Sequence, residues 1–197
     1  MKILIFDTET SGLPVLSDLR RYFHAKNLKY YENSRLIEIG YKIFDFKSEK
    51  VYVEYNELVK PDDFLISEKI SKIHGITHEK AVTEGININR ALDDFCRAIE
   101  FADVVLAYNV DFDINVVLSE AYRYNNRNLI NALKSKITAG KINCVMKIAK
   151  EKLNLRHIKL EKLYNQFFPH EKYVQTHRAL DDVELTIKCF LKLMKNS

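Results

Sequence analysis

At 197 residues, with 47% hydrophobic and 29% charged residues, the chain has an ordinary globular composition, which excludes disordered and collagen-like classes. The formal net charge of +4 permits a phosphate-rich partner but does not require one. The length predicts a single domain over residues 1–197, with the segment 15–33 as a candidate insertion.

The cysteines Cys96, Cys144 and Cys189 are odd in number, form no Cys-x-x-Cys motif and have no histidine at zinc spacing. We expect buried, reduced thiols and therefore a reducing compartment. The chain opens on a strand-like run without a signal-peptide layout, and no apolar run approaches the ~18 residues needed to cross a bilayer. The expectation is a cytoplasmic protein with no membrane partner.

The first half of the chain predicts strands. Within the strand-like run 2–7, residues 3–6 are apolar at consecutive positions, as in a strand covered on both faces. A short helix is predicted over 17–27, with Ser17 as its cap. Residues 35–46 and 50–59 predict two strands whose short connection implies an antiparallel hairpin.

From residue 66 onward the sequence pattern predicts mainly helices, several with recognisable ends. Gly75 is a candidate C-cap for a first helix, and Thr77 a candidate N-cap for a second. The predicted helices cover 66–74, 78–84, 88–101, 111–124, 160–168 and 177–195, and two further strands cover 103–108 and 141–145. This order predicts an α/β fold, a mixed sheet with helices packed on it.

Asp7 and Glu9 follow the first strand and point to the same face, because residues two apart on a strand share a face. Two adjacent carboxylates repel each other unless cations lie between them or one carboxylate is protonated. The alternative is that the strand ends at Phe6 and that both acids are solvated.

Two more places hold acids at helix starts. Asp113 would lie in the first turn of the 111–124 helix, with Asn109 or Asp111 as cap, and dipole compensation alone would explain it. His177 near the start of the last helix pairs with an acid one turn on, and helical spacing favours Asp181. A capping or surface role for His177 is the alternative.

Taken together these motifs are specific. The matching segments are residues 6–13, 35–40, 73–77, 109–113 and 177–182. The chain resembles the DEDDh 3′→5′ exonuclease family over residues 3 to about 190. The resemblance implies a ribonuclease H-like fold, in which three antiparallel strands are followed by parallel strands with helices on both faces. It also selects Asp182 over Asp181, and leaves Asp111 as the cap.

The resemblance implies a hydrolase that releases nucleoside 5′-monophosphates from the 3′ end of DNA or RNA. It assigns Asp7, Glu9, Asp113 and Asp182 as catalytic ligands of two Mg²⁺ or Mn²⁺ ions, and His177 as the general base, whose ordinary pKa suits that role. The implied substrate-binding residues are Thr8, Thr10, Leu13, His74, Ile76, Asn109 and Phe112.

Other readings stay open at this point. A haloacid dehalogenase-type phosphatase also begins with a strand and an aspartate, but it needs an aspartate where Glu9 stands. A nucleic-acid-binding module without activity would have lost one of the metal ligands, whereas all four acids and the histidine are present here. Many relatives carry histidine where this chain has Tyr108, and we expect little catalytic consequence. A homodimer is compatible with the family, association with a polymerase is not evident, and the choice between DNA and RNA is undetermined.

Overall fold

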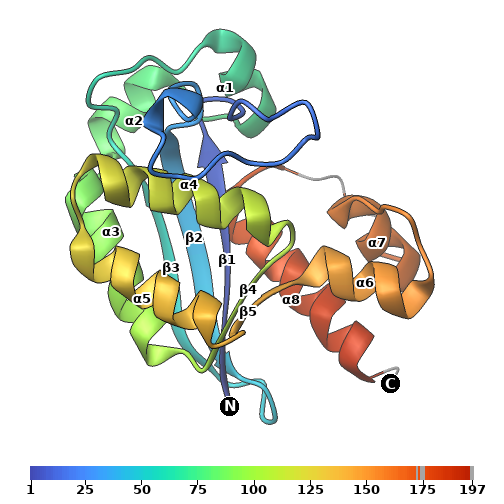
Figure 1. Ribbon diagram of the computed structural model, residues 1–197. Coiled ribbons are helices and arrows are strands. Elements are labelled where there is room, and N and C mark those ends of the chain that lie inside the picture. Colours follow the sequence, from blue (N-terminus) through green and yellow to red (C-terminus); the bar gives the residue numbers. More distant parts are fainter. Residues whose placement is uncertain (172, 174–175, 196–197) are drawn as a thin grey trace.

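A computed structural model describes residues 1–171, 173 and 176–195, which form one five-stranded sheet with helices on both faces (Figure 1). Its order is β3-β2-β1-β4-β5. β1 pairs antiparallel with β2, and β2 with β3, whereas β4 and β5 continue the sheet in parallel. The predicted mixed sheet is therefore confirmed. The strands are β1 (Lys2–Thr10), β2 (Leu36–Asp45), β3 (Val51–Leu58), β4 (Val104–Ala107) and β5 (Ile142–Cys144).

The two faces of β1 build two different cores, because its side chains alternate across the sheet. Leu4 and Phe6 pack with the helices α3 (Ile88–Phe101), α4 (Val110–Arg123) and α5 (Arg127–Thr138). Ile3 and Ile5 pack with the helices α6 (Val145–Leu153), α7 (Leu160–Phe167) and α8 (Ala179–Lys195). Burial on both faces explains why the strand is apolar at consecutive positions.

Two short helices, α1 (Glu68–His74) and α2 (His78–Glu84), follow the hairpin. Gly75 ends α1 with a φ of 73°, and the Thr77 side chain accepts a hydrogen bond from the Lys80 amide, so both predicted caps are confirmed. The helix α5 was not predicted. Its apolar side chains Leu129, Ile130 and Leu133 are buried against the first core, but the stretch is otherwise polar.

The predicted helix over 17–27 is wrong. Leu16 instead forms a bridge with Tyr22, and the Ser17 hydroxyl accepts a hydrogen bond from the Arg21 amide at 3.1 Å, so the chain folds back on itself. The only regular element within the described segment 15–33 is the 3₁₀ turn η1 (Leu28–Tyr30). Figure 1 shows this dark-blue segment beside α4, at the end of β1.

The cysteines Cys96, Cys144 and Cys189 are buried free thiols, as predicted. Among the described residues, no helix is both long and apolar enough to cross a membrane.

Candidate active site

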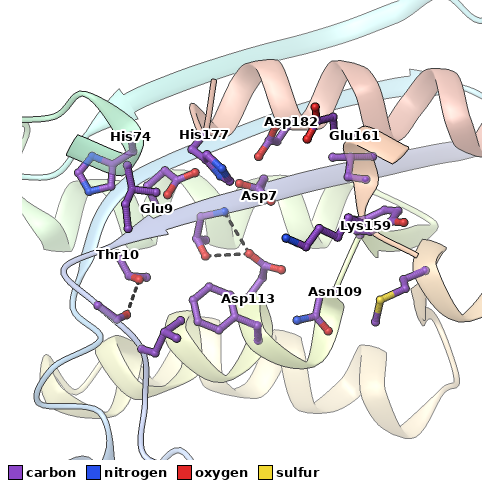
Figure 2. A pocket seen from close by; sticks show the side chains of 18 of the residues that line it. Asp7, Glu9, Thr10, His74, Asn109, Asp113, Lys159, Glu161, His177 and Asp182 are labelled. Atoms are coloured by element: carbon purple, nitrogen blue, oxygen red, sulfur yellow. Dashed lines mark hydrogen bonds between the residues drawn. The ribbon is translucent and has the colours of Figure 1, made fainter. Parts of the chain in front are cut away.

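The alternation of β1 decides which helix each polar side chain at its end meets. Asp7 and Glu9 continue the face of Ile3 and Ile5, toward α8, whereas Thr8 points to the other face, toward α4. Figure 2 shows the carboxylates gathering around the end of β1 from three separate segments.

Thr8 is the β1 residue that forms hydrogen bonds with Asp113. The Thr8 amide and hydroxyl donate to Asp113 Oδ1 at 3.1 and 2.8 Å, and the Asp113 residue is only 2% exposed. Asp113 lies in the first turn of α4, which begins at Val110. The expected cap role of Asp111 is wrong, because Asn109 holds the cap position and Asp111 pairs with Lys147 at 2.7 Å.

His177 precedes α8 in a left-handed backbone conformation with a φ of 52°, which is uncommon for a residue with a side chain. It therefore does not obey helical spacing, and Asp182 rather than Asp181 is brought to it. Ligand atoms of Glu9, His177 and Asp182 all lie within 4.8 Å of one another. Asp181 is exposed and accepts a hydrogen bond from Thr176 at 2.7 Å.

Burial and mutual repulsion raise the pKa values of this cluster. Burial and then the charges of Asp113 and Asp182 hold the pKa of Asp7 well above its usual range. Burial and then Asp182 raise the pKa of Glu9 to about 9. Burial raises the pKa of Asp113 to about 7, although both Thr8 hydrogen bonds lower it.

The cluster fits divalent cations. Within the part of the chain that the structure describes, no lysine or arginine forms an ion pair with Asp7, Glu9 or Asp113. Carboxylates held together without a basic partner are stable in the ionised form only if a cation joins them. Oxygen donors of this kind match the preferences of Mg²⁺ and Mn²⁺.

A cavity of about 760 Å³ opens over the carboxylates. Of the residues assigned to substrate binding, it is lined by Thr8, Thr10, Leu13, His74, Asn109 and Phe112. Leu13 is 76% exposed, whereas His74 is buried and its Nδ1 accepts a hydrogen bond from the Ile76 amide at 3.0 Å. The structure does not bring Ile76 to the cavity: its side chain is fully buried with Ile37 and Leu58, because α1 and α2 pack on that side of the sheet.

Sequence reasoning missed a basic residue, Lys159, that lines the cavity. Lys159 lies in the loop before α7, and Figure 2 shows its ammonium group pointing toward Asp7 and Asp113. The buried Tyr108 hydroxyl donates to the Ile158 carbonyl at 2.8 Å and so fixes this loop. The position that departs from the family pattern thus supports the lysine. No spacing rule links Tyr108 to Lys159, since only tertiary structure joins them.

A family model described as exonuclease, RNase_T, matches residues 4–190. The chain belongs to the RNase_T exonuclease family. The resemblance that the motifs carry is thereby confirmed. Over 196 residues the chain is 26% identical to the PolC-type DNA polymerase III of Caldanaerobacter subterraneus subsp. tengcongensis. That match covers 98% of this chain but only 12% of the polymerase, so the RNase_T chain corresponds to a small part of that protein.

Solved structures share the fold of this RNase_T chain. The nuclease domain of 3′hExo, a DEDDh family member bound to rAMP, superposes with a TM-score of 0.72 at 12% identity, covering 100% of this chain and 92% of that one. Exonuclease X in complex with 5′ overhanging duplex DNA gives a TM-score of 0.64 at 22% identity, covering 99% and 92%. The ribonuclease H-like exonuclease fold is therefore confirmed.

Proposed function

We propose that the protein is a metal-dependent 3′→5′ exonuclease that hydrolyses nucleic-acid phosphodiester bonds and releases nucleoside 5′-monophosphates. The observation that carries the proposal is the convergence of four acids and a histidine, drawn from β1, α4 and the start of α8, on one cavity. Family membership over residues 4–190 supports the same reaction class.

In this proposal Asp7, Glu9, Asp113 and Asp182 hold two Mg²⁺ or Mn²⁺ ions. Bound divalent cations supply an acidified water and neutralise charge on the leaving 3′ oxygen. His177 accepts the proton of the attacking water as general base, which its half-buried position at the cavity permits. The Thr8 amide and hydroxyl hold Asp113 in one orientation, so that ligand is already positioned before substrate arrives.

The terminal nucleotide would lie between Leu13, His74 and Phe112, because apolar and ring surfaces accept a base of any sequence. The Thr10 hydroxyl donates to the Gly12 carbonyl at 2.6 Å and shapes the turn that carries Leu13. Lys159 faces the carboxylates without forming an ion pair with them, which suits a contact to a substrate phosphate.

The partner in this proposal is the 3′ end of a DNA or RNA strand. We also propose that the chain acts as one domain and that the insertion 15–33 shapes the groove, since burial raises the pKa of Tyr22 while the neighbouring Asn109, which lines the cavity, lowers it. Both a monomer and a homodimer are compatible with this site.

Digestion of oligonucleotides labelled at the 5′ end tests the proposal. The expected result is a ladder shortened from the 3′ end, mononucleotides with a 5′ phosphate, complete inhibition by EDTA and recovery with Mg²⁺ or Mn²⁺. Digestion that is unaffected by the chelator, or release of inorganic phosphate without shortening, would contradict it. Matched single-stranded DNA, single-stranded RNA, duplex DNA and dinucleotides in the same assay identify the preferred substrate.

A further inference from the structure

A partly buried ion pair lies next to the histidine, with the Arg178 side chain 32% exposed and the Glu38 side chain fully buried. Glu38 on β2 is 0% exposed, and its carboxylate accepts hydrogen bonds from Arg178 Nε at 3.1 Å and from Arg178 Nη2 at 2.5 Å. Asn56 Nδ2 donates to the same carboxylate at 3.2 Å. Because Arg178 follows His177 in the chain, this contact fixes the backbone on one side of the histidine.

The same carboxylate also holds the first residue of α8. The Ala179 amide donates to Glu38 Oε2 at 3.0 Å, so Glu38 caps the helix from a neighbouring strand. Gly40 allows α8 to approach this closely, because a Cβ there would lie 2.7 Å from the Leu180 nitrogen and 2.8 Å from the Ala179 carbonyl carbon. Residues 178 and 179 are therefore seated on β2 by a specific, buried contact.

His177 itself needs such support. Its φ of 52° is a conformation that a residue with a side chain adopts only when its surroundings hold it. Glu38 lies opposite Glu9 in the antiparallel pairing of β1 and β2. The Glu38–Arg178 ion pair therefore lies beside one of the acids that are close to His177. Two like charges directly opposite are unfavourable, and Arg178 is the cation that offsets them.

We propose that Glu38 and Arg178 are positioning residues that hold His177 in its left-handed conformation at the cavity, and that they set the turnover rate rather than substrate or metal binding. This inference rests on the proposed function, because the histidine is taken as the general base. Glu38 acts through Arg178 and the Ala179 amide, not as a fifth metal ligand. The arginine occupies its carboxylate with a forked contact that a lysine would not reproduce.

The chain offers a matched control. Arg35 and Glu120 form another arginine–glutamate pair, 2.7 Å apart and more deeply buried, with both side chains 2% exposed, and Glu120 also accepts a hydrogen bond from a backbone amide, that of Leu36, at 3.2 Å. Arg35 directly precedes β2, the strand that carries Glu38. Its ion pair joins this strand to α4 and not to the start of α8. It therefore measures what the loss of a buried arginine–glutamate pair costs when His177 is not involved.

The experiment compares Glu38→Gln with Glu120→Gln in kcat, KM, melting temperature and Mn²⁺ affinity by calorimetry. We expect kcat of Glu38→Gln to fall by about tenfold to a hundredfold, since small displacements of a catalytic group cost that much. Its KM and Mn²⁺ affinity should stay within about threefold, and Glu120→Gln should lose comparable thermal stability while kcat stays within about threefold. Arg178→Lys, which keeps the charge but not the fork, should show the same kcat loss in smaller degree.

Equal kcat values for the two glutamine variants would overturn the proposal. So would a parallel loss of Mn²⁺ affinity in Glu38→Gln, which would make Glu38 a metal ligand. If Glu38→Gln does not fold, the same criteria apply to Arg178→Lys. Failure of the proposed function looks different, because the wild-type protein would then show no metal-dependent digestion at all.

Discussion

Two buried acids on α4 differ in the partners that the fold gives them. Asp113 and Glu120 lie roughly two turns apart on that helix, and both are almost fully buried, at 2% and 1% exposed. Glu120 forms an ion pair with Arg35, which also pairs with Asp63, whereas Asp113 accepts hydrogen bonds from the amide and hydroxyl of Thr8. Among the residues that the structure describes, Glu120 has ion pairs with arginines and Asp113 has none.

We infer that this difference separates an acid that stabilises the fold from one that binds cations. A buried carboxylate with its own arginine ties two elements together, and removing either partner leaves an uncompensated charge. A buried carboxylate in a cluster with raised pKa values instead stores an unfavourable interaction that a cation from solution relieves. Asp113 belongs to the second kind.

The largest effect on activity should come from replacing one of these two acids, Asp113, by its amide. Asp113→Asn keeps the oxygen that accepts from Thr8, so the fold should survive while kcat falls by about a thousandfold, the size expected when charge stabilisation is lost. Glu120→Gln should do the opposite, with a loss of about 3 kcal/mol in unfolding free energy and nearly intact kcat. Oligonucleotide digestion and urea unfolding measure both. An active Asp113→Asn protein would remove the distinction.

A smaller effect is expected from the cation that faces the cluster. Lys159→Ala should raise KM by about tenfold, with less change in kcat, and should weaken the salt dependence of binding by about one phosphate contact. Lys162→Ala, an exposed lysine on α7 outside the cavity, is the control and should match the wild type. Steady-state kinetics between 50 and 200 mM salt, about the range over which such contacts are resolved, would decide. Identical salt slopes in the two variants would exclude a phosphate contact by Lys159.

Thr8→Val removes the side-chain hydrogen bond that Asp113 accepts from β1. The variant keeps the amide but loses the hydroxyl that lowers the pKa of Asp113, so that pKa should rise further. Proton competition then weakens cation binding more at low pH, and we expect Mn²⁺ affinity to drop by about fivefold at pH 6.5 and by less at pH 8.5. Calorimetry at the two pH values measures this difference. An equal drop at both would indicate a purely steric effect.

The smallest effect concerns metal-free stability. Asp113 and Glu9 have folded-state pKa values of about 7 and about 9, above their ordinary values of 3.8 and 4.5. At a pH between its ordinary and its folded-state pKa, each group binds more protons in the folded state than in the unfolded state. Their stabilising contribution is present at low pH and is lost as pH rises through the folded-state values. In EDTA, the melting temperature should therefore fall from pH 5 to pH 8, and Mg²⁺ should reduce that fall.

Two variants test this assignment. Asp113→Asn should flatten the decline by removing one of the titrating groups. Asp63→Asn should leave it unchanged, because Arg35 lowers the pKa of Asp63 and places its titration below this range. A decline that Asp113→Asn does not alter would assign it to other groups.

Sequence and structure each account for different parts of the site. The apolar run before Asp7 predicted a central strand, and strand alternation placed Asp7 and Glu9 on one face, as observed. The caps at Gly75 and Thr77 were also predictable, because each depends on residues within a few positions. The segment 17–27 was not, since its residues form a turn closed by Ser17 and a ring contact between His24 and the distant Tyr122.

The strand that carries the acids, the order of most elements and, through the family motifs, the candidate acids and histidine can be read from the amino-acid sequence. The residues that surround them depend on tertiary contacts. Tyr108 holds the loop that carries Lys159, and Glu38 holds Arg178 beside His177, across separations of 50 and 140 residues. Local spacing carries no information about such pairs, because they form only when the folded chain brings distant segments together.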